Sequence, residues 1–146
     1  VASWLWNNDR HTLAHYFQSR ASEVYGVDIH PAAKLGKGIM IDHGTGVVIG
    51  ETSIVEDNVS IFQGVTLGGT GKEIGDRHPK VREGVLLSAS STILGNVEIG
   101  RNAKIAAGSV VLEDVKEGST VAGVPAKEVG KSDGLIPADE IDHSIK

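Results

Sequence analysis

An aliphatic residue recurs at every sixth position through the middle of the chain. Three runs show this spacing, and all their members are Val, Ile or Leu: Ile29, Leu35, Ile41; Ile49, Val55, Ile61, Leu67; and Val81, Leu87, Ile93, Ile99, Ile105, Val111. A period of six matches neither the 3.6 of an α-helix nor the alternation of a long strand. Hexapeptide repeats are typical of parallel β-helices, in which each repeat forms a short strand and a turn.

The glycines support the same fold. Seventeen of the 19 glycines lie between Gly26 and Gly123, where the corners of a β-helix need residues that tolerate positive φ. A β-sandwich with short strands is the alternative, but its turns fall at longer and less even intervals. We therefore predict a mainly β chain with one β-helical domain over residues 26–127.

Composition restricts the functional classes. A chain of 146 residues with a net charge of −5 indicates one domain and argues against broad binding to nucleic acid or to an anionic membrane. It has no apolar run long enough to span a bilayer and no signal peptide, so we expect a cytoplasmic protein. The absence of cysteine excludes disulfides, a thiolate metal site and a cysteine nucleophile.

The two ends of the chain differ from the repeats. Five of the six aromatic residues lie in the first 25 positions. Asp9 is a predicted N-cap, and Gly26 is predicted to end a helix whose apolar side chains follow at helical spacing. We predict that residues 1–25 form the end of a helical region packed on the β-helix, with Trp4 and Trp6 as packing residues. Residues 128–146 are predicted to form a flexible tail.

The repeat is interrupted at two places. Ile41 predicts the next inward residue at position 47, but the following run starts at Ile49, so the register slips by two beside Asp42 and His43. Residues 70–80 break the repeat completely, and this polar segment is predicted to loop out of the β-helix. Function often lies where a regular repeat is interrupted.

His43 is the candidate general base. Asp42 lies beside it, and coils of about 18 residues could bring Asp28 toward it from the neighbouring coil. A carboxylate behind an imidazole fixes its tautomer and raises its basicity, as a general base requires. His30 precedes Pro31 and is interpreted as structural. We assign no role to the remaining helical and tail histidines, His11, His15 and His143.

Arg77 and His78 place two possible cations at the tip of the predicted loop. Such a pair suits a carboxylate or a phosphate. A solvated loop without a ligand is equally consistent with the spacing alone.

Five motifs closely resemble the serine acetyltransferase family. They are Gly-Val-Asp-Ile-His-Pro-Ala-Ala-Lys (26–34), Ile-Asp-His-Gly-Thr-Gly (41–46), Gly-Val-Thr-Leu-Gly-Gly-Thr-Gly-Lys (64–72), Gly-Asp-Arg-His-Pro-Lys (75–80) and Ala-Gly-Val-Pro-Ala-Lys (122–127). The fourth motif is specific within the hexapeptide acyltransferases, and the last is shared more widely. The resemblance extends from Trp4 to about Lys131, and it implies a left-handed parallel β-helix that assembles as a homotrimer.

The resemblance also implies an activity and a set of site residues. The family transfers acetyl from acetyl-CoA to the hydroxyl of L-serine, the first step of cysteine biosynthesis, without a metal. By resemblance, His43 is the general base and Asp28 its orienting carboxylate. Asp42 would hold the serine ammonium, and Arg77 with His78 its carboxylate. The CoA contacts, in a cleft between subunits, correspond to Gly69, Thr70, Ala89, Ala107 and Lys127.

The family has further partners. L-cysteine shares the ammonium and carboxylate of serine, so we expect it to compete as a feedback inhibitor. The family carries a larger N-terminal helical domain that pairs trimers into hexamers, and this sequence retains at most its last helices. The family tail often ends in an isoleucine that docks O-acetylserine sulfhydrylase, whereas this sequence ends Ile145-Lys146. That partner is therefore left open.

Three other functions fit parts of the sequence. A hexapeptide acetyltransferase acting on another small hydroxyl acceptor is the nearest, although Arg77-His78 favours an acceptor with a carboxylate. A solenoidal zinc carbonic anhydrase would use three histidines across a trimer interface, but the paired histidine spacing of that family is missing. The third is a non-catalytic scaffold. The stabiliser of the oxyanion is not identified, with a backbone N–H or His78 as candidates.

Overall fold

The structure is a computed structural model that describes residues 1–131 and residue 137. Two helices come first, and fifteen short strands follow within the described part. They are α1 (Ala2–Asn7), α2 (His11–Tyr25), β1 (Asp28–Ile29), β2 (Lys34–Leu35), β3 (Met40–Ile41), β4 (Val48–Ile49), β5 (Ile54–Val55), β6 (Ser60–Ile61), β7 (Thr66–Gly68), β8 (Lys80–Val81), β9 (Leu86–Leu87), β10 (Thr92–Leu94), β11 (Glu98–Ile99), β12 (Lys104–Ile105), β13 (Val110–Val111), β14 (Ser119–Gly123) and β15 (Ala126–Lys131).

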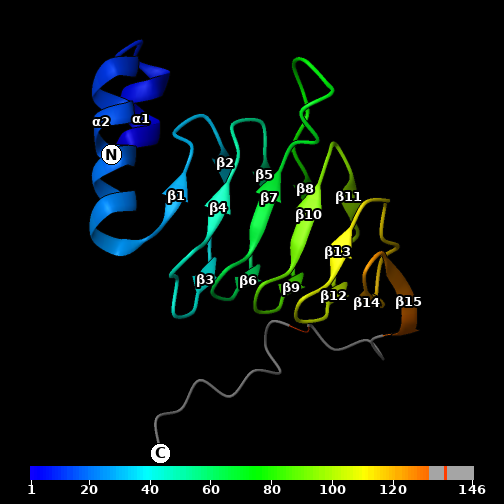
Figure 1. Ribbon diagram of the computed structural model, residues 1–146. Coiled ribbons are helices and arrows are strands. Elements are labelled where there is room, and N and C mark those ends of the chain that lie inside the picture. Colours follow the sequence, from blue (N-terminus) through cyan, green and yellow to red (C-terminus); the bar gives the residue numbers. More distant parts are fainter. Residues whose placement is uncertain (132–136, 138–146) are drawn as a thin grey trace, which may run out of the picture.

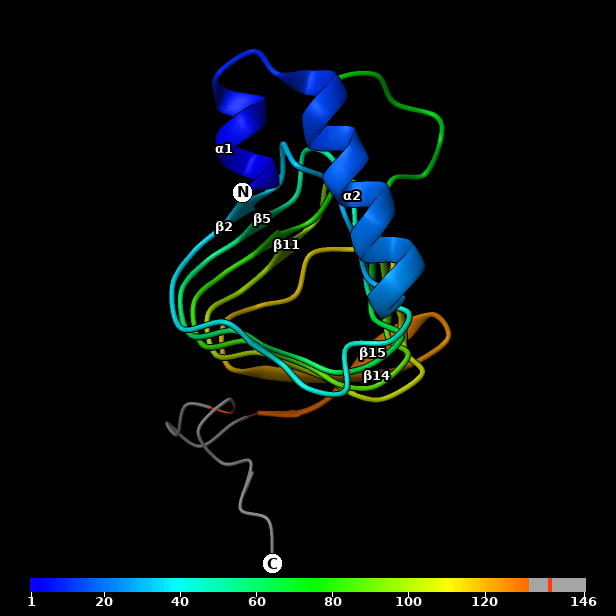
Figure 2. The same cartoon turned by 90° about the vertical axis from the view of Figure 1, so that its left-hand side faces the viewer.

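The strands form three sheets that make the sides of a triangular prism (Figures 1 and 2). One sheet has the strand order β1-β4-β7-β10-β13, the second β11-β8-β5-β2, and the third β15-β14-β12-β9-β6-β3. All pairs are parallel except β14 with β15. Each of the first four coils thus contributes one strand to each sheet, as the hexapeptide period predicts. The predicted left-handed parallel β-helix is confirmed.

The aliphatic runs build the interior of the prism. Every member of the second and third runs is buried, with at most 2% of its surface exposed. The first run is different, because it belongs to the coil at the open end: Leu35 is 43% exposed and Ile41 is 36% exposed. The repeat therefore predicts which aliphatic side chains point inward. It does not predict how exposed they are in the coil at the end of the prism.

The two helices lie at this open end of the prism, and α2 runs along the side of the five-stranded sheet (Figure 2). Gly26 ends α2 in the left-handed region with φ 67°, as predicted. The predicted N-cap Asp9 is wrong. Arg10 occupies the cap position without a side-chain hydrogen bond, and Asp9 itself has a positive φ of 56° in the turn before it.

Trp6 fixes the helices to the first coil. Its ring lies 4.1 Å from the ring of His11 and 5.0 Å from the ring of His30, between centroids. This confirms the packing role of Trp6, whereas Trp4 is 62% exposed. Neither helix in the described part has the length and apolar character needed to cross a bilayer.

The β-helix closes with the antiparallel pair of β14 and β15. Because β15 extends to Lys131, the ordered pairing passes the boundary expected at Lys127 by four residues. Most of the expected tail, 128–146, lies outside the described residues.

Candidate functional site

Two groups of turns border the five-stranded sheet and hold most of the candidate residues. The turns that precede β4, β7, β10 and β13 stack on one another, and we call them the amino corner. The turns that follow β1, β4, β7 and β10 stack at the other side of the same sheet, and we call them the carboxyl corner.

The amino corner contains the two extra residues of the first coil. Ile41 pairs with Ile61, twenty residues on, whereas Val48 pairs with Thr66, eighteen residues on. The N–H of Asp42 donates to the carbonyl of Ile61, and the carbonyl of Thr45 accepts from Gly64, so the insertion is His43 and Gly44. The register slip is confirmed, and the insertion contains the candidate base itself.

The backbone of this insertion is left-handed. His43 has φ 59° and Gly44 has φ 61°. A positive φ is uncommon for a residue other than glycine, and such strained positions cluster at functional sites. The insertion presents the His43 side chain to solvent, with 72% of it exposed, and its Nε2 lies 3.7 Å from Oδ1 of Asp42.

Asp28 begins β1, on the coil next to this insertion. Its Oδ1 accepts a 2.7 Å hydrogen bond from Nε2 of Gln18 on α2. In the part of the chain that the structure describes, no hydrogen bond or ion pair joins Asp28 to His43. The expected pairing of these two residues stays a prediction.

Two residues predicted to contact CoA lie in one column of the amino corner. The N–H of Ser90 donates to the carbonyl of Gln63, and the N–H of Gly108 donates to the carbonyl of Ala89. Ala89 and Ala107 are therefore equivalent residues of successive coils. Because both side chains are small, little side-chain volume projects from this part of the corner. The turn between β14 and β15 continues this edge, since Gly123 N–H donates to Oγ of Ser109. Lys127 follows that turn and is exposed.

The carboxyl corner contains the large excursion. Ile54 pairs with Lys80, 26 residues on, so this coil is eight residues longer than the coils after it. The loop between β7 and β8, residues 69–79, projects from the prism (green in Figures 1 and 2). Gly69 and Thr70 begin this loop, where Gly69 borders Arg77 and the methyl group of Thr70 borders Gly95.

Arg77 and His78 end the loop and fold back on Thr52, so their predicted place at the tip is wrong. The fully exposed Ile74 lies farther out in the loop. Their backbone N–H groups donate to Oγ1 of Thr52 at 3.0 and 3.1 Å. The prediction failed because it counted only the polarity of the segment and not the hydrogen bonds that anchor its end.

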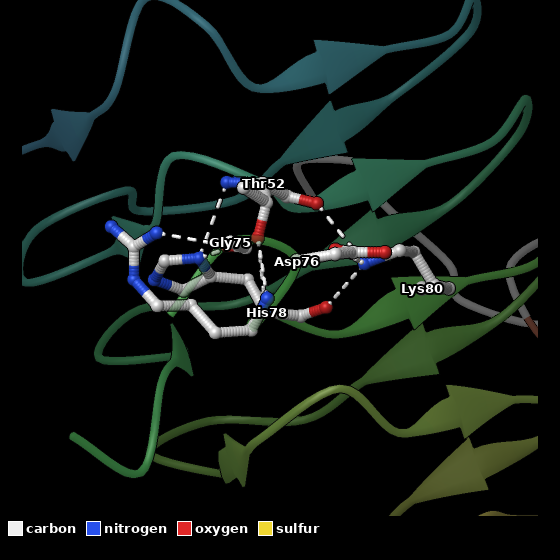
Figure 3. Close-up of polar contacts among 6 residues, drawn as sticks. Thr52, Gly75, Asp76, His78 and Lys80 are labelled. Atoms are coloured by element: carbon white, nitrogen blue, oxygen red, sulfur yellow. Dashed lines mark hydrogen bonds and ion pairs between the residues drawn. The ribbon is translucent and has the colours of Figure 1, made fainter. Parts of the chain in front are cut away.

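Thr52 is the centre of a hydrogen-bond network at this corner (Figure 3). Its N–H donates to Nδ1 of His78 at 3.2 Å, and its hydroxyl lies 2.9 Å from the same nitrogen. Nζ of Lys80 donates to the carbonyls of Thr52 and His78 and to Oδ1 of Asp76. The network fixes both the start of β8 and the imidazole of His78.

The charge of His78 differs from the prediction, whereas Arg77 is the cation of an ion pair. His78 is only 7% exposed, and burial, followed by the charge of Arg77, lowers its pKa. His78 is therefore neutral near pH 7 and not a cation. Arg77 donates from Nη2 to Oε2 of Glu51 at 2.6 Å and from Nη1 to the carbonyl of Gly75. The hydrogen bond from Arg77 lowers the pKa of Glu51.

His30 lies at the carboxyl corner, one coil before Thr52. Its Nδ1 accepts from the N–H of Ala32 at 3.1 Å, and its ring packs against Trp6 and His15. Burial lowers its pKa. These contacts support a structural role. No group of three or more His, Asp or Glu residues in the described ranges has a geometry that could hold a metal ion.

Sequence reasoning missed Glu51 and Thr52. Both lie 26 residues before the Arg77-His78 pair, which is one coil plus the eight-residue insertion. Subtracting the length of the insertion from the repeat would have placed positions 51 and 52 beside the end of the loop.

Comparisons with known proteins identify the relatives of this chain. The family model described as bacterial transferase hexapeptide (six repeats) matches residues 78–113. The serine acetyltransferase of Escherichia coli K12 is 58% identical over 142 residues, which are 97% of this chain and 52% of that protein. Serine acetyltransferase 4 of Arabidopsis thaliana is 59% identical over 143 residues, 98% of this chain and 40% of that protein. The chain thus spans about half the length, or less, of these curated relatives.

Two solved structures resemble this chain closely. A serine acetyltransferase in complex with cysteine has a TM-score of 0.93 at 58% identity, over 99% of this chain and 56% of that one. The serine acetyltransferase of Brucella abortus strain S19 in complex with coenzyme A has a TM-score of 0.89 at 59% identity. That match covers 90% of this chain and 52% of the other.

Proposed function

Since the chain belongs to the serine acetyltransferase family, we propose that it transfers the acetyl group of acetyl-CoA to the hydroxyl of L-serine and produces O-acetylserine. The observation that carries this proposal is the position of His43. It lies in a two-residue insertion in the first turn of the amino corner, the corner in which Ala89 and Ala107 stack. The amino corner therefore contains both a candidate base and a stretch of small side chains along which a long cosubstrate could lie.

His43 takes the role of general base in this proposal. Its imidazole accepts the proton of the serine hydroxyl as the oxygen attacks the thioester carbonyl. The C–S bond then breaks, and the proton on His43 passes to the departing CoA thiolate. The chain contains no cysteine, so transfer is direct and has no cysteinyl acyl-enzyme. Asp28 orients the imidazole, and Asp42, beside His43, holds the serine ammonium.

Arg77 and His78 hold the serine carboxylate. Arg77 uses two of its N–H groups on Glu51 and on the carbonyl of Gly75. A guanidinium has five such donors, so others stay available for a carboxylate. His78 adds a neutral N–H donor beside it. A small acceptor that bears both an ammonium and a carboxylate is thereby distinguished from a sugar.

We further propose that the site is completed between subunits of a homotrimer. Asp42 and His43 lie at the amino corner, whereas Arg77 and His78 lie at the carboxyl corner of the same sheet. Three-fold packing of identical prisms places the amino corner of one subunit against the carboxyl corner of the next. CoA lies in the same cleft, with Gly69 and Thr70 from one side and Ala89, Ala107 and Lys127 from the other.

Regulation and partners follow from the same site. Free L-cysteine fits the serine positions, since it has the same ammonium and carboxylate, and we propose it as a competitive inhibitor. A serine acetyltransferase of known structure has been solved with cysteine bound. Pairing of trimers into hexamers and docking of O-acetylserine sulfhydrylase would involve segments outside the described residues.

A thiol-release assay with acetyl-CoA tests the proposed function. Release of CoA that depends on L-serine, with O-acetylserine as the product, supports it. Release with other small hydroxyl acceptors but not with L-serine contradicts it and indicates a different hexapeptide acetyltransferase. D-serine and ethanolamine are matched controls, because D-serine has the opposite configuration at Cα and ethanolamine has no carboxylate.

A further inference from the structure

We propose that Thr52 and Gly50 are positioning residues that hold His78 as a neutral imidazole with its proton on Nε2, directed to the carboxylate of the amino-acid substrate. This inference rests on the proposed function for the identity of the ligand. The geometry of the imidazole itself does not depend on that identity.

The hydroxyl of Thr52 is fully used as an acceptor. It accepts the backbone N–H groups of Arg77 and His78 at 3.0 and 3.1 Å, which occupies both of its lone pairs. Its own proton is left to donate, and the acceptors beside it are Nδ1 of His78, 2.9 Å away, and the carboxylate of Asp76. Removing the hydroxyl would therefore leave two N–H groups and one imidazole nitrogen without this partner.

The same contacts select the tautomer of His78. Nδ1 accepts from the backbone N–H of Thr52 at 3.2 Å, and the Thr52 hydroxyl beside it has no lone pair left to accept a proton from it, so Nδ1 carries no proton in the neutral ring. The proton is consequently on Nε2, which has no hydrogen-bond partner among the described residues. Adding a second proton at Nδ1 would turn both contacts with Thr52 into donor–donor clashes.

Most of the charges around His78 also oppose its protonation. Arg77 and Lys80 do so, and His30 does so to a smaller extent, whereas Glu51 favours it. Burial is the largest effect, and it lowers the pKa. The Thr52 contacts explain why a histidine beside Glu51 still serves as a neutral donor.

Gly50 determines where the ring lies. A Cβ at position 50 would be 2.1 Å from both Cδ2 and Nε2 of His78. The φ of Gly50 is not in the left-handed region, so the backbone itself does not require glycine. The close approach of the imidazole is the physical reason for a glycine at this position.

Nitrogen NMR of histidine-labelled protein tests the tautomer directly. The signals of His78 are assigned by their loss in His78→Asn. In the unaltered chain we expect a protonated Nε2 and an unprotonated Nδ1 that persist below pH 6.5, the usual pKa of histidine. Thr52→Ser retains the hydroxyl and should keep both features. Thr52→Val should shift the Nδ1 signal and raise the pKa of His78, and Gly50→Ala should displace the ring signals.

Ser53→Ala is the matched control. Ser53 is the next residue, and its buried hydroxyl has no hydrogen-bond partner in the described structure, so its loss should leave the His78 signals unchanged. An unprotonated Nε2 in the unaltered chain would overturn the proposal. So would His78 signals and a pKa that are the same in Thr52→Val and in the unaltered chain, or a Thr52→Ser variant that behaves like Thr52→Val. If Thr52→Val does not fold, Thr52→Ser and Gly50→Ala decide.

Steady-state kinetics tests the role toward the substrate. Loss of a hydrogen bond to a charged group corresponds to roughly a 10- to 100-fold effect. Thr52→Val should therefore raise KM for serine by about tenfold or more, while KM for acetyl-CoA and kcat change by less than about threefold. A fall in kcat at constant KM would contradict a carboxylate role. Absence of serine acetylation by the unaltered chain would refute the proposed function, while the NMR experiment would still decide the positioning of His78.

Discussion

His43 and His78 lie at opposite corners of one parallel sheet. His43 precedes β4, and His78 follows the neighbouring strand β7 and its loop. Both lie in or beside an insertion that interrupts the 18-residue coil, one of two residues and one of eight. The regular coils provide a rigid prism, and the two insertions present the polar side chains from it.

His43→Ala should reduce kcat by about 10²- to 10⁴-fold, because general-base catalysis typically contributes that much. Affinity for CoA should change little, since the proposed contacts lie along other residues of the corner. Asp28→Asn should cost less, because the proposed role of Asp28 is to orient the ring and not to accept the proton. Initial rates and CoA titration by calorimetry measure these effects. Retention of more than about a tenth of the rate would show that His43 is not the base.

The periodicity predicted the fold because burial in a prism with three sides requires one inward aliphatic residue per strand. Ile93 and its equivalents are buried as expected. The same rule could not predict that Leu35 and Ile41 are partly exposed, because exposure at the end of the prism depends on what covers it. Likewise, Asp9 has the side chain of an N-cap, but the turn that joins α1 to α2 places Arg10 there.

The site was predicted in part. The register slip identified the corner of His43, since extra backbone in a repeat has to form a bulge. The neutral state of His78 was not predictable from its neighbours in the sequence. It depends on burial and on Thr52, 26 residues away, which reaches His78 only through the stacking of coils.

Core substitutions should show the difference between the middle and the end of the prism. Ile93→Ala should lower the free energy of unfolding by about 2–5 kcal/mol, as is usual for a fully buried aliphatic residue. Leu35→Ala, at an inward position of the first coil but 43% exposed, should cost less. Urea denaturation followed by circular dichroism measures both. Equal losses would indicate that the open end is covered in solution.

Stability should depend on pH through His30 and His78. Both have a pKa in the folded chain below the usual 6.5. Between these values the unfolded chain binds more protons than the folded chain, so stability is fully present above about pH 6.5 and decreases as the pH falls below it. His78→Gln should make the unfolding free energy less dependent on pH between 7.5 and 5.5. An unchanged slope in this variant would contradict the assignment of His78 as a buried neutral imidazole.

Free L-cysteine should compete with L-serine. It has the same ammonium and carboxylate for the proposed contacts with Asp42, Arg77 and His78, with a thiol in place of the hydroxyl. Cysteine should raise the apparent KM for serine and leave the extrapolated maximal rate unchanged, as followed by loss of the thioester absorbance. N-acetylcysteine is a matched control that lacks the ammonium. Unchanged rates at low serine with millimolar cysteine would contradict a shared site.

Subunit complementation tests the central claim most directly, namely that one site is built from the amino corner of one chain and the carboxyl corner of another. His43→Ala and Arg77→Ala are purified separately, unfolded, mixed in equal amounts and refolded together, with each variant refolded alone as the control. In random trimers about a quarter of the interfaces combine an intact His43 with an intact Arg77 from the neighbouring chain. The account predicts that the mixture regains about a quarter of the wild-type rate at low serine, whereas each variant alone stays inactive. A mixture that is no more active than the two variants alone would contradict it.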